Sequence, residues 1–325
     1  MTIRAPSGSA HHHPWAIVLA AGDGVRLRPL TRRLYGCDLP KQFAKLVGGR
    51  SLLQATLDRI ARLIPPHRTV VVVGEAHREV ARDQLEGYRG VEVVVQPRNV
   101  GTAPGILLPL SRIRAHAPDA SVAIFPSDHH VTRPRPLLDG VRTGLDSTRQ
   151  QGGIALIGAR AEHAETDYGW ILAGQDEDAP RSAAVPVSRF VEKPGAREAE
   201  CLLRQGALWN TFMMTGRAQE LWETMRRHMP RTVELFEGYA RSAGRDHEPG
   251  ALAELYARLD PGDFSRDVLQ HMSGLTVVPV HGSGWSDWGS PRRVFESLRG
   301  RPECAELQAR LERTARPHLE LVAQS

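Results

Sequence analysis

Glycine and basic residues follow the first apolar run of the chain. Residues 16–21 read AIVLAA, and Gly22 and Gly24 interrupt this run before Arg26 and Lys41. Glycines let backbone amides approach an anion closely. Arginine can bind two phosphate oxygens at once, and lysine adds a compact positive charge. The segment could therefore bind a polyphosphate, and the alternative is an ordinary glycine turn with solvated charges.

Two familiar phosphate-binding motifs do not describe this segment. The third glycine of the dinucleotide-binding fingerprint is missing, and so is the Gly-Lys-Ser/Thr sequence of the Walker A loop. The segment nevertheless follows a predicted strand, and open α/β sheets bind ligands beyond the carboxyl ends of their strands. An anion site of another type is expected there.

Two isolated aspartates could hold a metal. Asp128 follows the apolar run 121–126, and Asp287 stands between Trp285 and Trp288. Magnesium is usually bound by one or two carboxylates together with substrate phosphates and water. The cysteines and histidines lack the spacing of a zinc site. The pattern favours magnesium (Mg²⁺), although an aspartate at such a position is also a common turn former.

Alternating strands and helices must position these side chains. Buried strands are expected at the apolar runs 15–21, 69–74, 91–95, 121–126, 152–158, 188–194, 208–215 and 275–280. Helices are expected at 51–64, 75–87, 102–117, over most of 216–259, and at 290–300 and 303–322. Ser51 and Gln54 fit a capping box, and Pro109 is a candidate kink. This alternation predicts a mainly parallel sheet covered on both faces.

The composition excludes several classes of protein. The chain has 325 residues, a net charge of +5 and three widely spaced cysteines. No apolar run approaches the roughly 18 residues of a membrane helix, and no secretory signal is expected. Basic residues alternate with acidic ones, so nucleic acid is not an expected partner. A cytoplasmic location fits the few cysteines. We expect a flexible arm at 1–14, a catalytic domain at 15–290 and a helical tail at 291–325.

Eight segments in sequence order resemble the sugar-1-phosphate nucleotidyltransferases, and among them the mannose-1-phosphate guanylyltransferases. These segments are LAAGDGVRLRPLT with PKQF, QPRNVGTAPG, FPSDHHV, TDYGWI, FVEKP, LWNTFMM, FSRDVLQ and WSDWGS. The resemblance implies a Rossmann-like three-layer α/β fold with a mostly parallel central sheet and a helical C-terminal tail. It also implies magnesium-dependent guanylyl transfer from GTP to mannose 1-phosphate, giving GDP-mannose and pyrophosphate.

The resemblance assigns a role to each matching residue. Arg26 would hold the leaving pyrophosphate, and Lys41 would neutralise charge near the α-phosphate. Magnesium would be held by Asp128 and Asp287. Residues expected to contact the nucleotide are Gly22, Gly24, Asn99, Gly101, Thr102 and Pro104. Residues expected to contact the sugar phosphate are Gly169, Glu192, Lys193 and Asn210.

Elementary chemistry agrees with this reaction, and three alternatives stay open. A sugar phosphate has a second pKa of about 6 and is already an oxyanion nucleophile at neutral pH. The remaining work is positioning and fixed positive charge. The alternatives are another base (UTP or dTTP), another sugar such as glucose, and a non-catalytic nucleotide-sugar sensor. The sequence leaves a homo-oligomer open.

Three features depart from the family pattern. Tyr35 and Cys37 lie in an insertion of unknown shape, Phe212 stands where glycine is common, and Asp167 stands where a small residue is common. Phe212 is expected to crowd the sugar side, which puts mannose in question. Longer relatives carry an isomerase half, and isomerase activity is not expected for this chain.

Overall fold

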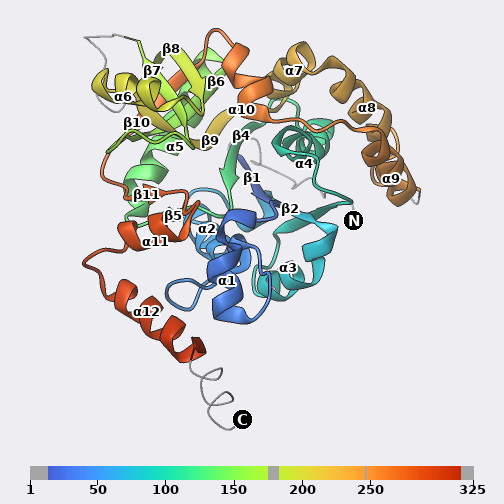
Figure 1. The fold of residues 1–325 in the computed structure, drawn as a ribbon. Helices are drawn as coiled ribbons and strands as arrows, with labels where there is room; N and C mark the ends of the chain where they lie inside the picture. Colours follow the sequence, from blue (N-terminus) through green and yellow to red (C-terminus); the bar gives the residue numbers. More distant parts are fainter. Residues whose placement is uncertain (1–13, 175–182, 246, 316–325) are drawn as a thin grey trace.

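A nine-stranded mixed sheet forms the centre of the molecule (Figure 1). A computed structural model describes residues 14–174, 183–245 and 247–315. The predicted arm 1–14 therefore lies almost wholly outside the described residues, as does the end of the predicted helix 303–322. The strand order is β3-β2-β1-β4-β9-β6-β10-β8-β7.

The first four strands of this order run parallel to one another. They are β3 (Glu92–Gln96), β2 (Thr69–Gly74), β1 (Trp15–Ala20) and β4 (Ser121–Pro126). Each is an apolar run that the sequence predicts as a strand. Their carboxyl ends meet at one edge, so the glycine loop after β1 and Asp128 after β4 emerge side by side.

The other half of the sheet contains most of the antiparallel pairs. It comprises β9 (Leu208–Arg217), β6 (Ile154–Arg160), β10 (Thr276–Val280), β8 (Val185–Glu192) and β7 (Gly169–Ala173). Strand β9 runs antiparallel to β4, β6 and β7, and β7 pairs with β8 as an antiparallel ribbon. The sheet is thus mixed rather than mostly parallel. Strand β7, which the sequence analysis did not predict, supplies Gly169.

Helices cover both faces, which confirms the predicted three-layer α/β architecture. In β1, Trp15 and Ile17 belong to one apolar cluster, and Ala16 and Val18 belong to the other. This alternation is the two-residue period of a strand buried on both faces. The first cluster includes residues of α4 (Thr102–His116), α7 (Ala218–His228), α8 (Pro230–Ala240) and α9 (Glu248–Arg258). The second includes residues of α2 (Leu52–Ile60), α3 (Arg78–Leu85), α5 (Pro134–Gln151) and α6 (Ala196–Arg204).

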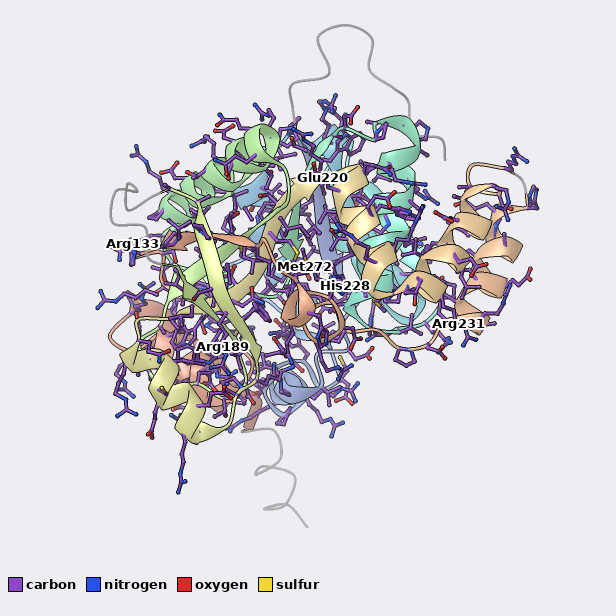
Figure 2. The ribbon with its side chains drawn as sticks, turned by 90° about the horizontal axis from the view of Figure 1, so that it is seen from above. Arg133, Arg189, Glu220, His228, Arg231 and Met272 are labelled. Carbon is purple, nitrogen blue, oxygen red and sulfur yellow. The ribbon has the colours of Figure 1, made fainter. Side chains whose placement is uncertain are left out.

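Local signals in the sequence explain several helix boundaries. The Ser51 side chain accepts from the backbone of Gln54 and the Gln54 side chain accepts from that of Ser51, so the predicted capping box is present. Helix α4 continues through Pro109, which does not end it. Figure 2 shows the molecule from above, with Glu220 and His228 on α7 and Arg231 at the start of α8. In the described part of the chain, no helix is long and apolar enough to cross a membrane.

The C-terminal segment folds back over the N-terminal half. A short strand, β11 (Trp285–Ser286), pairs with β5 (His130–Val131). Helices α11 (Pro291–Ser297) and α12 (Pro302–Ala315) share a third apolar cluster with α1 (Arg28–Tyr35). This return places Asp287 beside the glycine loop.

The insertion around Cys37 forms a turn that side-chain hydrogen bonds hold in place. The Tyr35 hydroxyl donates to the Lys45 carbonyl and accepts from the Lys45 amide. Arg32 binds both carboxylate oxygens of Asp38 at 2.7 Å. Cys37 is exposed at the end of this turn.

A close backbone contact joins the start of α4 to the segment around Gly262. Gly101 has φ +97°, and a Cβ atom there would lie 2.2 Å from the Gly262 carbonyl oxygen. The same carbonyl accepts from the Ala103 amide, and the Gly262 amide donates to the Val100 carbonyl. Only glycine fits at 101, because both the space and the backbone conformation exclude a side chain.

Replacing Gly101 by alanine is therefore expected to lower the free energy of unfolding by about 2 kcal/mol or more. Urea unfolding followed by circular dichroism measures the change. Gly87→Ala is the matched control, because no atom would lie within 4 Å of its added Cβ. Equal stability of the two variants would contradict the close contact.

Candidate active site

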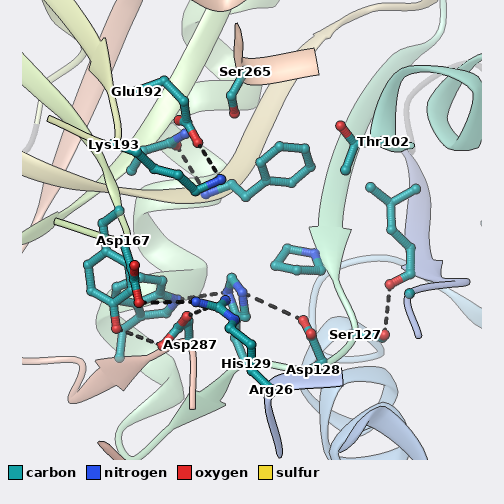
Figure 3. A pocket seen from close by; sticks show the side chains of 18 of the residues that line it. Arg26, Thr102, Ser127, Asp128, His129, Asp167, Glu192, Lys193, Ser265 and Asp287 are labelled. Atoms are coloured by element: carbon teal, nitrogen blue, oxygen red, sulfur yellow. Dashed lines mark hydrogen bonds and ion pairs between the residues drawn. The ribbon is translucent and has the colours of Figure 1, made fainter. Parts of the chain in front are cut away.

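A cavity of about 270 Å³ opens at the carboxyl ends of β1 and β4 (Figure 3). Most of the side chains predicted to act together line it. They are Gly22, Arg26, Thr102, Asp128, Gly169, Glu192, Lys193, Asn210 and Asp287. A neighbouring hollow of about 260 Å³ is lined by Gly24, Arg26, Lys41 and Asp128, among others. Tertiary structure thus brings together residues that are up to 265 positions apart, from Gly22 to Asp287.

Three residues predicted for the nucleotide pocket line neither of these two cavities. Asn99 is exposed; its side chain donates to Asp23 at 3.0 Å and accepts from the Gly101 amide at 3.1 Å. Gly101 lies against the backbone of Gly262, and Pro104 is buried in the first turn of α4. Their predicted roles toward a base stay predictions, while the contacts seen here shape the loop next to the cavity.

Hydrogen bonds from Gln42 hold the glycine loop in place. This side chain is buried and donates to the carbonyls of Ala20 at 3.0 Å and Gly22 at 2.7 Å. Gly24 has φ +59°, and a Cβ atom there would lie 2.8 Å from the Lys41 amide nitrogen. The PKQF segment therefore lies directly against the loop. Gln42 belongs to the PKQF motif, and the sequence alone did not predict this role for it.

Lys41 connects the two aspartates. Its ammonium lies 3.0 Å from the Asp128 carboxylate and donates to the backbone carbonyl of Asp287. The lysine side chain is only 8% exposed, so this charge is held in place. A fixed cation between the ends of two loops can stabilise a bound anion without reorganisation.

Asp287 is held by four groups. One carboxylate oxygen, Oδ1, accepts from the Tyr168 hydroxyl at 2.7 Å and from the Gly289 amide at 2.8 Å. Arg293 donates to both carboxylate oxygens at 3.2 Å. The second oxygen, Oδ2, also faces the Arg26 guanidinium at 3.5 Å. A Cβ at position 289 would lie 2.4 Å from Oδ2, so the turn requires glycine.

The surroundings of both aspartates favour the ionised form. Burial raises the pKa of Asp128, but the charge and the hydrogen bond of Lys41 act in the opposite direction, and the net effect of the surroundings holds that pKa below its usual range. Burial acts in the same direction on the pKa of Asp287, where Lys41 and Arg293 outweigh it. A partly exposed carboxylate, Asp128, and a buried one, Asp287, thus share one cavity that fixed cations surround.

The two histidines after Asp128 have structural contacts. Burial lowers the pKa of His129 to about 4, so its ring is neutral at physiological pH. Its Nδ1 accepts from the Trp285 indole at 3.2 Å, which leaves the proton on Nε2, 3.6 Å from Asp128. His130 stacks on Trp288 with ring centroids 4.2 Å apart. These rings support the Asp128 and Asp287 turns.

Arg293 is a site residue that the sequence analysis missed. It is 11% exposed and donates to Glu165 at 2.8 Å and to Asp167 at 2.9 Å as well as to Asp287. Its guanidinium also lies over the Tyr168 ring, 4.7 Å from the centroid. It belongs to α11, in the segment expected to be a helical tail. No motif in the sequence marks it, because its partners come from distant segments.

Asp167 forms an ion pair with Arg26, the arginine expected to bind pyrophosphate. Its carboxylate lies 3.2 Å from the Arg26 guanidinium, and these two side chains are 52% and 56% exposed. Figure 3 shows Asp167, Arg26 and Asp287 on one side of the cavity, with Glu192 and Lys193 across from them. Arg26 is therefore paired with carboxylates of the protein itself, and a phosphate chain would have to compete with them.

The opposite side of the cavity contains the residues predicted to contact the sugar phosphate. The Lys193 ammonium lies 3.2 Å from Glu192, and burial raises the pKa of Glu192. A Cβ on Gly169 would lie 2.7 Å from the Glu192 carboxylate and 3.2 Å from the Asn210 Cβ. Gly169 therefore lets these two side chains approach each other.

Backbone strain is concentrated around this cavity. Among the described residues, the non-glycine residues with positive φ are Lys193 (+48°), Phe212 (+58°) and Trp288 (+45°). Lys193 and Phe212 line the cavity, and Trp288 follows Asp287. Such conformations persist where the surrounding structure enforces them, and they are common at functional sites.

Comparisons with known proteins agree with this arrangement. The sequence profile of the family described as nucleotidyl transferase matches residues 15–300. The xanthan biosynthesis protein XanB of Xanthomonas campestris is 32% identical over 285 residues, which cover 84% of this chain and 57% of the relative. A mannose-1-phosphate guanylyltransferase of Escherichia coli is 26% identical, with 86% of this chain and 59% of the relative covered. The chain thus spans a little over half the length of these relatives.

A solved structure has the same fold. It is described as mannose-1-phosphate geranyltransferase from Thermus thermophilus. It superposes with a TM-score of 0.76 at 29% sequence identity, and covers 89% of this chain and 80% of that chain.

Replacing Arg293 by alanine is expected to lower the free energy of unfolding by about 3 kcal/mol, because Asp287 and Glu165 would stay buried without their cation. Thermal and urea unfolding measure the loss. Arg292→Ala is the control: this neighbour is 81% exposed and pairs with Glu296 on the surface, so a change of about 0.5 kcal/mol is expected. A stable Arg293→Ala protein would refute the buried network.

Proposed function

Because the chain belongs to the nucleotidyl transferase family, we propose that it catalyses magnesium-dependent guanylyl transfer from GTP to mannose 1-phosphate. The products would be GDP-mannose and pyrophosphate. One observation carries this proposal: Arg26, Lys41, Asp128 and Asp287 surround adjoining cavities at the carboxyl ends of two parallel strands. Fixed cations and two ionised carboxylates are what a reaction between two polyanions requires.

The reaction needs no proton acceptor. An oxygen of the sugar phosphate attacks the α-phosphorus of the triphosphate, and the bond from that phosphorus to its bridging oxygen breaks. Pyrophosphate leaves with the electron pair. Because the acceptor is already an oxyanion at neutral pH, a neutral, hydrogen-bonded His129 is no obstacle. The protein has to align two anions and compensate their charge.

The cations have separate roles in this proposal. Lys41 is fixed between Asp128 and the Asp287 carbonyl, so it would meet the phosphate where the new bond forms. Arg26 is more exposed and pairs with carboxylates at 3.2 and 3.5 Å, so it can turn toward the leaving pyrophosphate. Lys193 and Glu192 lie across the cavity and would receive the acceptor.

The two aspartates fit a magnesium ion. Among the described residues, no group of three or more acidic, histidine or cysteine side chains could hold a metal. Magnesium needs only one or two carboxylates, however, with phosphates and water as further ligands. Asp287 Oδ1 is bonded to Tyr168 and Gly289, and Oδ2 is paired with Arg293 and Arg26, so magnesium would compete with these two guanidinium groups for Oδ2. Bound magnesium would supply charge neutralisation on the phosphates.

The choice of base and sugar rests on resemblance. The E. coli relative is named a mannose-1-phosphate guanylyltransferase, and the PSDH and GTAP segments match that branch. A cytoplasmic location is part of the proposal, since all three cysteines are free. The other candidates are the same chemistry with UTP, dTTP or glucose 1-phosphate, and a sensor that binds nucleotide sugar without turnover. The intact charged residues favour an enzyme.

A substrate panel tests this proposal. Four nucleoside triphosphates are combined with mannose, glucose and fucose 1-phosphates in the presence of magnesium, and pyrophosphate release is measured. GTP with mannose 1-phosphate is expected to give the highest kcat/KM. Turnover with UTP or dTTP but not GTP would refute guanylyl transfer. Binding of GDP-mannose without any turnover would favour the sensor.

The Lys41→Met variant tests whether this activity takes place at the cavity. The variant keeps the length of the side chain and removes its charge, so kcat is expected to fall by a factor of about 100 or more. Lys45→Met is the matched control, because Lys45 is exposed nearby. If both variants kept wild-type activity, the reaction would take place elsewhere.

Removing the Asp167 carboxylate is expected to strengthen binding of phosphate chains, because Arg26 would lose a competing anion. Exposed ion pairs are worth up to about 1 kcal/mol, so the nucleotide Kd and the pyrophosphate inhibition constant should both fall about two- to fivefold in Asp167→Ala. Calorimetry and product-inhibition kinetics measure these constants. Asp146→Ala, which breaks an exposed pair with Arg149, is the control. Weaker nucleotide binding in Asp167→Ala would show that this carboxylate assists binding.

A further inference from the structure

Strand β9 contains a bulge that faces the cavity. On one side of the irregularity Ile157 pairs with Met213, and on the other Gly158 pairs with Asn210. Thr211 and Phe212 are therefore extra residues between two paired positions of the register. Bulges redirect a side chain out of the regular alternation of a strand, and they are common next to functional sites.

Two side chains fix this bulge. The Thr211 hydroxyl donates to the Ile157 carbonyl at 2.6 Å and accepts from the Met213 amide at 3.2 Å. The Asn210 side-chain oxygen accepts from the Phe212 amide at 3.0 Å. Thr211 and Asn210 are buried. The Asn210 oxygen is thus used within the protein, and its amide nitrogen is the part left to contact a ligand.

The conformation of Phe212 is unfavourable for an aromatic residue. Its φ is +58°, in the left-handed region where glycine carries no penalty. The neighbouring bonds impose this backbone geometry on whatever residue occupies the position. A residue that only had to complete the bulge would be better served by glycine or asparagine. The ring therefore contributes something that offsets the strain.

The ring forms an apolar wall of the cavity. Phe212 is half-buried, packs against the first apolar cluster and lines the cavity together with Lys193, Glu192 and Asn210. These three are the charged and polar groups on the acceptor side. A phenyl ring beside them cannot hydrogen-bond a hydroxyl group, and it occupies volume that a glycine would leave open.

We propose that Phe212 is a specificity-determining residue for the acceptor sugar. Its ring limits the room beside the polar contacts and admits sugar 1-phosphates whose edge there is compact and carries hydrogen or methyl. It disfavours acceptors with a bulky polar substituent at that edge. This inference rests on the proposed function, since it assigns the selectivity of the same site.

Three variants at this position separate the ring from the strain. Phe212→Ala and Phe212→Gly both remove the ring, Phe212→Leu keeps apolar bulk, and only Phe212→Gly relieves the strain. The kcat/KM for the best wild-type acceptor is compared with that for an N-acetylhexosamine 1-phosphate, using pyrophosphate release. The ratio is expected to shift at least about tenfold toward the bulky acceptor in the alanine and glycine variants. The leucine variant should stay within about threefold of wild type.

Two further readouts exclude a merely structural role. The KM for the nucleotide should change less than about twofold in all three variants, because the ring faces the acceptor. Phe212→Gly should melt at a higher temperature than Phe212→Ala, since alanine retains the strained φ. An unchanged acceptor ratio, or an equal loss of rate with both acceptors, would overturn the proposal.

The selectivity of Phe212 can also be measured without turnover. If the wild-type protein turns over no pair of substrates, the proposed reaction fails. Calorimetric Kd values for the same two sugar 1-phosphates with wild type and Phe212→Ala then decide the selectivity. A Kd ratio that moves toward the bulky sugar supports the role of Phe212, and an unmoved ratio refutes it.

Discussion

The pairing of two carboxylates with fixed cations at the end of a sheet is the constraint on which the rest of the site depends. Lys41 and Arg293 help to keep Asp128 and Asp287 ionised, because each cation lies at hydrogen-bond distance from one of these carboxylates. Each cation comes from a different part of the chain, so the charge balance exists only in the folded protein. The fixed charges therefore lie in a half-enclosed cavity, where they would interact with phosphate groups more strongly than in bulk water.

The glycines and the strained residues follow from this crowding. Gly24, Gly169 and Gly289 stand where a Cβ would meet a neighbouring backbone atom or carboxylate within 3 Å. Conversely, Lys193 and Phe212 retain side chains at backbone angles that suit glycine. The glycines therefore leave room for charged groups to lie close together. The strained residues Lys193 and Phe212 instead place side chains on the wall of the cavity.

Much of the fold follows from local patterns in the sequence. The apolar runs at 69–74 and 121–126 are strands with the predicted bounds, and Ser51 starts its helix as predicted. The direction of β9 is a different matter: an apolar run does not encode whether its neighbours in space are parallel or antiparallel. The bulge at Phe212 likewise depends on Ile157, 55 residues earlier in the chain.

By itself, the sequence predicted the kind of chemistry: glycines, an arginine and a lysine after a strand, together with two isolated aspartates, predict a polyanion site, because each signal is local. Tertiary structure alone decided how these groups are paired. Arg293 joins Asp287, Glu165 and Asp167, Gln42 fixes the glycine loop, and Arg26 is held by carboxylates. These pairings depend on which distant segments meet, and such meetings are set by packing of the whole core rather than by spacing along the chain.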